Sequence, residues 1–106
     1  MSKRERLSDE AISAFLNGPG RAGWSRVGEA LERAYAFPDY SAAVGFTMRV
    51  ALLAERRDHH PDLLLGWGKV RVTWSTHDAG GITALDVEMA EQCDRLHGDL
   101  SPSRQG

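Results

Sequence analysis

Three of the four histidines stand where the chain leaves a regular element, a common place for side chains that transfer protons. His59 and His60 follow a long apolar stretch with helical spacing, and His77 follows a strand-like alternation. An imidazole has an ordinary pKa near ~6.5, so it can donate and accept protons at neutral pH. Glu55 lies four residues before His59, and a helix that persisted that far would let its carboxylate orient the His59 ring. These residues predict a general acid/base site.

Other interpretations of these residues stay open. A histidine pair at a helix end is often a solvated cap that the helix dipole favours. Asp86 stands three residues after Thr83, so it can be a capping carboxylate as well as a site residue. A metal site that uses these histidines with His77 or Asp78 is a weaker alternative and no metal is predicted, because adjacent His59 and His60 project in different directions and the chain has no cysteine pair and no HExxH sequence. Cys93 lies in an apolar stripe and is expected to be a small hydrophobe.

Three helices are predicted around these residues. The first begins at the capping residue Ser8 and ends before the Asn-Gly-Pro-Gly run at 17–20. The second covers about residues 41–57 and is apolar on nearly all sides, so a neighbouring helix or a second subunit should cover it. The third begins at the Thr83-x-x-Asp86 capping box.

Four strands are predicted between the helices. They cover about residues 24–27, 31–37, 63–65 and 69–75, with a two-residue turn at Gly28-Glu29. Val70, Val72 and Trp74 alternate with polar residues, and the three leucines at 63–65 predict a buried strand. The economical packing is an α+β fold, a four-stranded, mostly antiparallel sheet with three helices on one face. The order is helix, strand, strand, helix, strand, strand, helix.

Length and charge limit the classes of protein. A chain of 106 residues fits a single domain over 1–106, with a core at about 8–97 and a polar tail at 98–106. The net charge of −2, from 13 basic and 15 acidic residues, provides no positive excess for binding nucleic acid. No apolar run approaches the ~20 residues of a membrane-spanning helix. A lone cysteine fits a reducing cytoplasm.

A longer pattern joins the candidate site residues and resembles the pterin-4a-carbinolamine dehydratase family (4a-hydroxytetrahydrobiopterin dehydratase). The pattern is Glu, three residues, His-His-Pro, five residues, an aromatic residue, nine residues, His, eight residues and Asp. The residues that fill it are Glu55, His59, His60, Pro61, Trp67, His77 and Asp86. The resemblance extends to Gly23-Trp24 and to residues 46–51, and covers about residues 8–97. Residues 62–66, Asp-Leu-Leu-Leu-Gly, depart from the family's more aromatic or polar run.

The resemblance implies that water is removed from 4a-hydroxytetrahydropterin to give quinonoid dihydropterin, which recycles the pterin after aromatic amino acid hydroxylation. It also implies four catalytic residues: His59 and His77 as general acids, His60, which mainly holds the pterin and shares in proton transfer, and Glu55, which orients His59. The further substrate-binding residues that it implies are Trp24, Trp67 and Asp86. Tryptophans are more often part of a core, so these two could also serve only the fold. The reaction needs acid/base groups and no metal or redox cofactor.

The resemblance, together with the apolar second helix, further implies a homodimer or homotetramer with a small pterin as substrate, while charge and hydropathy predict no nucleic acid and no membrane as partners. An alternative from another class stays open, a non-catalytic interaction module on the same fold. The family includes members that act as dimerisation partners of transcription factors and members that assist RuBisCO assembly. A pure scaffold has no need of all three histidines, so the dehydratase is the favoured interpretation.

Overall fold

The computed structural model describes residues 3–100, which contain three helices, four strands and one short 3₁₀ turn. The elements in chain order are α1 (Asp9–Leu16), β1 (Ser25–Val27), β2 (Ala30–Ala36), α2 (Tyr40–Arg57), β3 (Asp62–Gly66), β4 (Lys69–Trp74), η1 (His77–Ala79) and α3 (Ala84–Leu100). The predicted α+β class and order of elements are confirmed.

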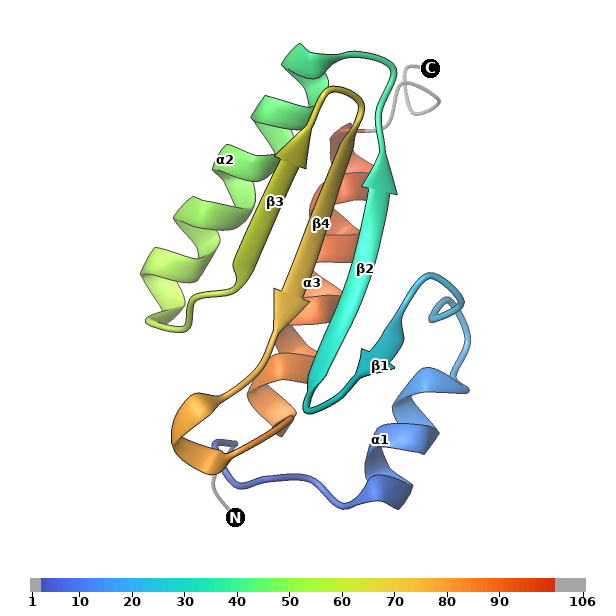
Figure 1. Cartoon of the computed structure of the whole chain (residues 1–106), viewed down its shortest axis with the longest axis vertical. Helices are drawn as coiled ribbons and strands as arrows, with labels where there is room; N and C mark the ends of the chain where they lie inside the picture. The colour runs from blue at the N-terminus through green and yellow to red at the C-terminus, as the bar shows by residue number, and fades with distance from the viewer. Residues whose placement is uncertain (1–2, 101–106) are drawn as a thin grey trace.

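The four strands form one antiparallel sheet in the order β1-β2-β4-β3 (Figure 1). Two-residue turns join the strands of each hairpin, one at Gly28-Glu29 as predicted and one at Trp67-Gly68. Gly28 has a φ of 60°, a left-handed conformation that glycine adopts at little steric cost. The pairing of Leu31 with Trp74 places the start of β2 beside the end of β4.

Helices α2 and α3 contact each other and cover the same face of the sheet, while α1 lies beside β1 (Figure 1). Alternation along β4 places Val70, Val72 and Trp74 under these helices, where all three are fully buried. Further core side chains come from β2 and the two long helices: Leu31, Tyr35, Ala43, Phe46, Val50, Met89, Ala90 and Cys93. Burial raises the pKa of the Cys93 thiol to about 12, as expected for a cysteine that acts as a small hydrophobe.

Local side-chain contacts define the helix ends close to the predicted positions. The Ser8 hydroxyl accepts a hydrogen bond of 3.1 Å from a backbone N–H in the first turn of α1. The Asp39 carboxylate accepts one of 2.8 Å in the first turn of α2. At the other end of α2, Asp58 adopts a left-handed conformation with a φ of 51°. This residue ends the helix directly before His59.

The strand of three leucines is not buried, so that prediction is wrong. β3 is an edge strand covered by helices on one face only, and its side chains therefore alternate between the two faces. Leu64 is 59% exposed, while Leu63 and Leu65 are half-buried against the core. α3 continues to Leu100, past the expected core boundary at 97, and the remaining tail at 101–106 lies outside the described residues.

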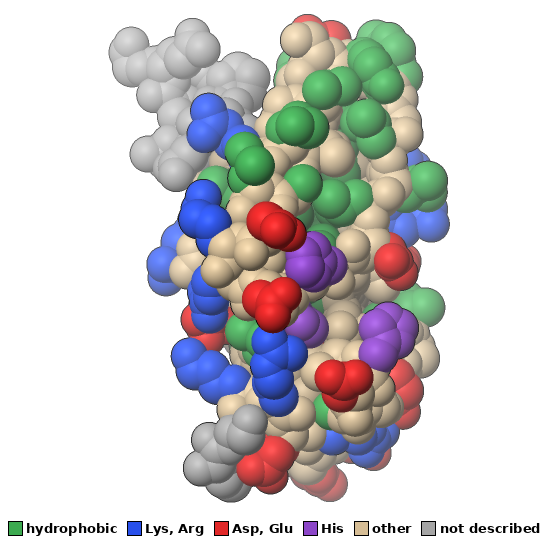
Figure 2. Space-filling model, turned by 90° about the vertical axis from the view of Figure 1, so that its left-hand side faces the viewer, with side chains coloured by type: hydrophobic (Ala, Val, Ile, Leu, Met, Phe, Trp, Pro, Cys, Tyr) green, Lys and Arg blue, Asp and Glu red, His purple; other side chains and the backbone are tan. Residues whose placement is uncertain are grey.

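The apolar surface of α2 is only partly covered by the rest of the fold. Met48 and Leu52 are 55% and 57% exposed, although Phe46 and Val50 of the same helix are fully buried. Figure 2 shows hydrophobic side chains gathered on this side of the molecule, with histidines lower on the same side. Within residues 3–100, none of the helices combines the length and apolar character that crossing a bilayer requires.

Candidate functional site

The predicted histidines come together at one end of the sheet, where α2 ends, β3 begins and β4 ends (Figure 1). His59 and His60 lie between α2 and β3, and His77 lies in η1 just after β4. The antiparallel pairing of Asp62 with Thr73 holds these two segments side by side. Residues that are 17 or 18 positions apart in the sequence therefore border one site.

His59 is buried and is held on two sides. Its Nε2 lies 2.6 Å from Asp86 Oδ1, and only 6% of the residue is exposed. Its ring stacks on Trp74, with 5.6 Å between the ring centroids and 17° between their planes. The carboxylate at Nε2 fixes the orientation of the imidazole and leaves Nδ1 as the nitrogen that can serve a ligand.

Asp86 caps α3 and positions His59 at the same time. Its Oδ2 accepts a hydrogen bond of 2.9 Å from the backbone N–H of Thr83, which confirms the predicted capping contact. The same oxygen accepts one of 2.8 Å from the Thr76 hydroxyl, while Oδ1 faces His59. Because Asp86 is fully buried, these contacts compensate for removing its carboxylate from water.

Glu55 contacts His60, so the prediction that it orients His59 is wrong. Glu55 Oε1 lies 2.9 Å from His60 Nε2, and both side chains are exposed. The cause is the left-handed Asp58, which ends α2 before the helical i,i+4 geometry can reach His59. The chain turns His59 inward toward Asp86 and leaves His60 outside, within reach of Glu55.

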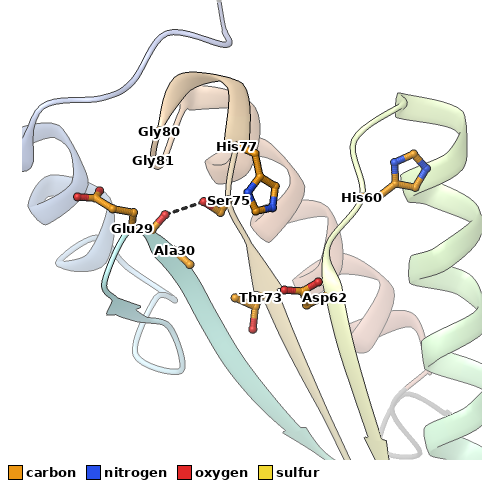
Figure 3. Close-up of a pocket in the computed structure, with 9 residues that line it drawn as sticks. All are labelled: Glu29, Ala30, His60, Asp62, Thr73, Ser75, His77, Gly80 and Gly81. Atoms are coloured by element: carbon orange, nitrogen blue, oxygen red, sulfur yellow. Dashed lines mark hydrogen bonds between the residues drawn. The ribbon is translucent and has the colours of Figure 1, made fainter.

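Two adjoining hollows open beside the histidines. The larger has a volume of about 420 Å³, and the residues that line it include Glu29, His60, Asp62, Thr73, Ser75 and His77 (Figure 3). The smaller has a volume of about 230 Å³ and adds His59, Arg4 and Asp58. His60, Ser75 and His77 border both hollows. The larger space is within the size range of small-molecule sites.

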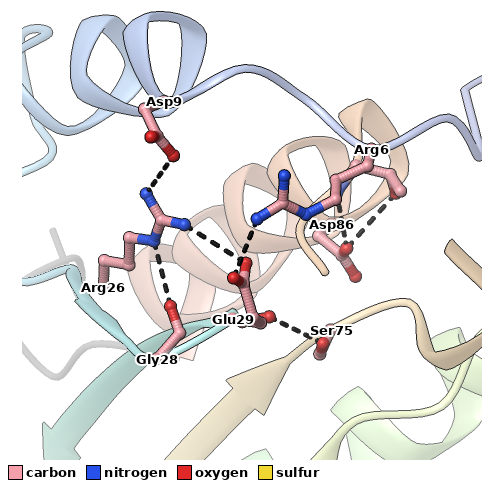
Figure 4. Close-up of polar contacts among 8 residues, drawn as sticks. Arg6, Asp9, Arg26, Gly28, Glu29, Ser75 and Asp86 are labelled. Carbon is pink, nitrogen blue, oxygen red and sulfur yellow. Dashed lines mark hydrogen bonds and ion pairs between the residues drawn. The ribbon is translucent and has the colours of Figure 1, made fainter. Parts of the chain in front are cut away.

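Ion pairs to the N-terminal segment hold the wall of the larger hollow at the β1–β2 turn (Figure 4). Glu29 pairs with Arg6 at 2.8 Å and with Arg26 at 3.2 Å, and Arg26 also pairs with Asp9 at 2.9 Å. The hydrogen bond from Arg6 is the main cause that lowers the pKa of Glu29, and Arg26 lowers that of Asp9 in the same way. The Ser75 hydroxyl donates to the Glu29 carbonyl at 2.7 Å and joins β4 to this wall.

The two tryptophans that the resemblance assigns to substrate binding lie away from both hollows. Trp24 is 5% exposed and donates its Nε1–H to Asp94 at 3.0 Å, which is a contact within the core. Trp67 is 70% exposed in the β3–β4 turn, at the opposite end of β4 from the histidines (Figure 1). The tryptophan that does support the site is Trp74, through its stacking on His59.

Several polar residues of the larger hollow escape the sequence reasoning. Thr73 and Ser75 could have been found from their parity on β4, which is opposite to that of the buried Val72 and Trp74. Glu29 and Asp62 could not, because only the strand order brings the starts of β2 and β3 to the same end of the sheet. Among the described residues, no group of three or more His, Cys, Asp or Glu could hold a metal ion.

Comparison with known proteins gives the site a family context. Residues 5–96 match the family described as Pterin 4 alpha carbinolamine dehydratase. A protein of Bradyrhizobium sp. (strain BTAi1), provisionally named pterin-4-alpha-carbinolamine dehydratase, is 46% identical over 92% of this chain and 98% of its own length. A protein of Natronomonas pharaonis with the same provisional name is 42% identical over 87% of this chain and 96% of its own.

Two solved structures have a similar fold. A transcriptional coactivator/pterin dehydratase from Brucella melitensis has a TM-score of 0.78 at 38% identity, covering 87% of this chain and 98% of that one. A pterin dehydratase-like protein, described as a RuBisCO assembly factor in the alpha-carboxysome, has a TM-score of 0.62 at 25% identity, covering 72% and 90%. The family match over most of the chain, together with these identities, shows that this chain belongs to the pterin-4-alpha-carbinolamine dehydratase family.

Proposed function

We propose that this protein removes water from 4a-hydroxytetrahydropterin to give quinonoid dihydropterin, through acid/base catalysis by its histidines. The observation that carries the proposal is the placement of His59, His60 and His77 around two adjoining hollows. Two of these rings are also oriented by carboxylates. Several titratable rings that border one space are useful for proton transfer and have no evident use in a scaffold.

The reaction requires one proton to be delivered and another to be removed. The 4a-hydroxyl is protonated, the C4a–O bond breaks, and its electron pair leaves with the oxygen as water. N5 loses its proton as the double bond between C4a and N5 forms. The net reaction consumes no proton and changes no oxidation state, so imidazoles that exchange protons with the substrate and with water are sufficient.

The surroundings of each histidine suggest its role. His77 is exposed and borders both hollows, so in this proposal it is a general acid for the 4a-hydroxyl. His59 is the second acid/base group and acts through Nδ1, because its Nε2 lies on Asp86. His60 borders both hollows and is oriented by Glu55, so it holds the pterin.

The test is the rate of dehydration of 4a-hydroxytetrahydropterin, generated in situ by a phenylalanine hydroxylase, with and without this protein and without added metal. We expect acceleration well above the uncatalysed rate. A folded protein that gives no acceleration would contradict the proposal. That result would favour the interaction module, the class to which the structural neighbour described as a RuBisCO assembly factor belongs.

We also propose that the chain forms a homodimer or homotetramer through α2 and the adjacent β3, and that it acts in the cytoplasm. Met48 and Leu52 lie one helical turn apart on α2, and each of them, like Leu64 of β3, is more than half exposed. Exposed apolar patches of this kind mark protein–protein contacts. The free, buried Cys93 fits a reducing compartment.

A further inference from the structure

The larger hollow extends past the histidines onto the outer face of the sheet, where its polar side chains are hydrogen-bond acceptors (Figure 3). Asp62 is the first residue of β3 and pairs in register with Thr73 of β4. Glu29 lies on the opposite wall, at the β1–β2 turn. Apart from the histidines, the described residues that line this hollow include no basic side chain.

The hydroxyl groups of Thr73 and Ser75 in this part of the hollow already donate their protons to other groups of the protein. Thr73 Oγ1 donates to Glu32 Oε2 at 3.1 Å, and Ser75 Oγ donates to the Glu29 carbonyl at 2.7 Å. A hydroxyl has one proton and two lone pairs, so each of these groups can only accept a hydrogen bond from a ligand. The hydroxyls and the nearby carboxylates therefore form one acceptor surface.

Asp62 has the largest unused acceptor capacity on this surface. The Glu29 carboxylate is already engaged by Arg6 at 2.8 Å and by Arg26 at 3.2 Å. Asp62 is exposed, and its carboxylate makes no hydrogen bond or ion pair within the part of the chain that the structure describes. A ligand with paired N–H groups would therefore meet a carboxylate at Asp62 that forms no ion pair with any described residue.

We infer that Asp62, with Thr73 beside it, binds the N–H donor edge of the pterin ring, which is formed by the 2-amino group and N3–H. This inference rests on the proposed function. The two donors point side by side, the geometry that a carboxylate accepts in pairs. The 2-amino group lies across the pyrimidine ring from C4a, so a ring held at this edge by Asp62 directs C4a back toward the histidines. Asp62 is thus a substrate-binding residue that selects 2-amino pterins and sets the orientation of the ring.

The test compares the binding of two unreactive compounds by calorimetry. They are 7,8-dihydropterin and 7,8-dihydrolumazine, in which a carbonyl oxygen replaces the 2-amino group. We expect Asp62→Asn to weaken dihydropterin binding roughly 10- to 100-fold, because hydrogen bonds to a charged acceptor are the stronger class. The same substitution should weaken dihydrolumazine binding much less, because that compound keeps N3–H but presents an acceptor in place of the 2-amino donor. Asp39→Asn is the matched control, since Asp39 only caps the far end of α2 and asparagine also caps helices.

Equal dihydropterin affinity of wild type and Asp62→Asn would overturn the inference, even in a protein that catalyses the dehydration. A wild type that binds both compounds equally well would overturn it too. Failure of the proposed function has a different signature, since the wild type would then neither accelerate the dehydration nor bind dihydropterin. Circular dichroism spectra of Asp62→Asn and the wild type should coincide, which would show that any loss of binding is not caused by unfolding.

Discussion

At the scale of single residues, the three histidines differ in what their side chains support. His77 and His60 are exposed, and among the described residues no buried side chain is hydrogen-bonded to either of them. His59 is buried between the Asp86 carboxylate and the Trp74 ring. Loss of His59 would remove the partner of Oδ1 in the buried Asp86 carboxylate, while Oδ2 keeps its bonds to Thr76 and Thr83, so the replacement should reduce stability as well as catalysis.

Replacement of His77 by alanine should lower kcat/KM for dehydration roughly 100- to 10,000-fold, the usual contribution of one acid/base group. The thermal midpoint should stay close to that of the wild type, because the His77 side chain is exposed. His60→Ala should act mainly by raising KM, because His60 is proposed to hold the pterin. Steady-state dehydration kinetics with thermal unfolding measure both effects. Wild-type kinetics in both variants would show that the reaction takes place elsewhere.

Two substitutions of Asp86 should separate its capping role from its positioning role. Asp86→Ala removes the acceptor for the Thr83 N–H and the partner of His59, so we expect it to lower the free energy of unfolding by about 3 kcal/mol and to reduce activity. Asp86→Asn keeps an oxygen for the cap but loses the negative charge beside His59. It should retain more stability and still lose most activity. Urea unfolding measures the stability of both variants, and dehydration assays measure their activity. Full activity in Asp86→Asn would show that Asp86 serves only as a capping residue.

The three histidines that meet at the site could be predicted from the sequence, but the partners of their side chains could not. His59, His60 and His77 were found from their positions at element ends. The partners of His59 and His60 depend on the left-handed backbone of Asp58. Because of this turn, His60 and not His59 faces Glu55, and His59 faces Asp86. The sequence gives only a weak indication of a left-handed conformation at a residue other than glycine, so these partners could not be predicted.

At the scale of elements, the end of α2 determines the directions in which the side chains of His59 and His60 point. Asp58 has a φ of 51°, a conformation that is costly for residues with a side chain and free for glycine. We expect the free energy of unfolding to rank Asp58→Gly above wild type and Asp58→Ala below it, with steps of about 1 kcal/mol or less. Urea denaturation measures this ranking. An alanine variant as stable as the glycine variant would contradict the left-handed conformation.

Elements with local signals were predictable, and elements defined by pairing across the chain were not. The turn at Gly28-Glu29, the cap at Ser8 and the capping contact of Asp86 all involve residues within a few positions of each other. The exposure of Leu64 instead depends on the tertiary packing, because the helices cover only one face of the sheet and Leu64 lies on the other face. Trp67 matched the family spacing but lies on a turn far from the site, because sequence spacing alone does not give spatial position.

At the scale of the whole molecule, His97 should make stability depend on pH. Burial is the main cause that lowers the pKa of His97, which packs against Tyr35, Phe37 and Phe46, and the charge of Arg33 adds to it. The unfolded chain then binds the proton more readily than the folded one, so stability falls as the pH drops below about 6.5.

The wild-type thermal midpoint should therefore fall more between about pH 7.5 and about pH 5.5 than that of His97→Gln, because only the wild type has this titrating group. The remaining histidines are common to both proteins and cancel in the comparison. Parallel pH profiles of the two proteins would contradict the burial of His97.

The proposed oligomer makes a second prediction at this scale. Leu52→Glu places a charge in the exposed apolar face of α2, so it should lower the mass in solution from a multiple of the chain mass toward that of one chain. Val27→Glu is the matched control, since Val27 is 53% exposed on β1, away from α2 and β3. Analytical ultracentrifugation reports the masses. A monomeric wild type, or a Leu52→Glu protein of unchanged mass, would contradict an interface on α2.

The most direct test of the central claim is the rate of 4a-hydroxytetrahydropterin dehydration by the wild type beside the double variant His60→Ala/His77→Ala. Both side chains are exposed, so the double variant should remain folded. Catalysis by these histidines predicts strong acceleration by the wild type and a rate close to the uncatalysed one with the variant. A folded double variant as fast as the wild type, or a wild type no faster than the uncatalysed reaction, would contradict it.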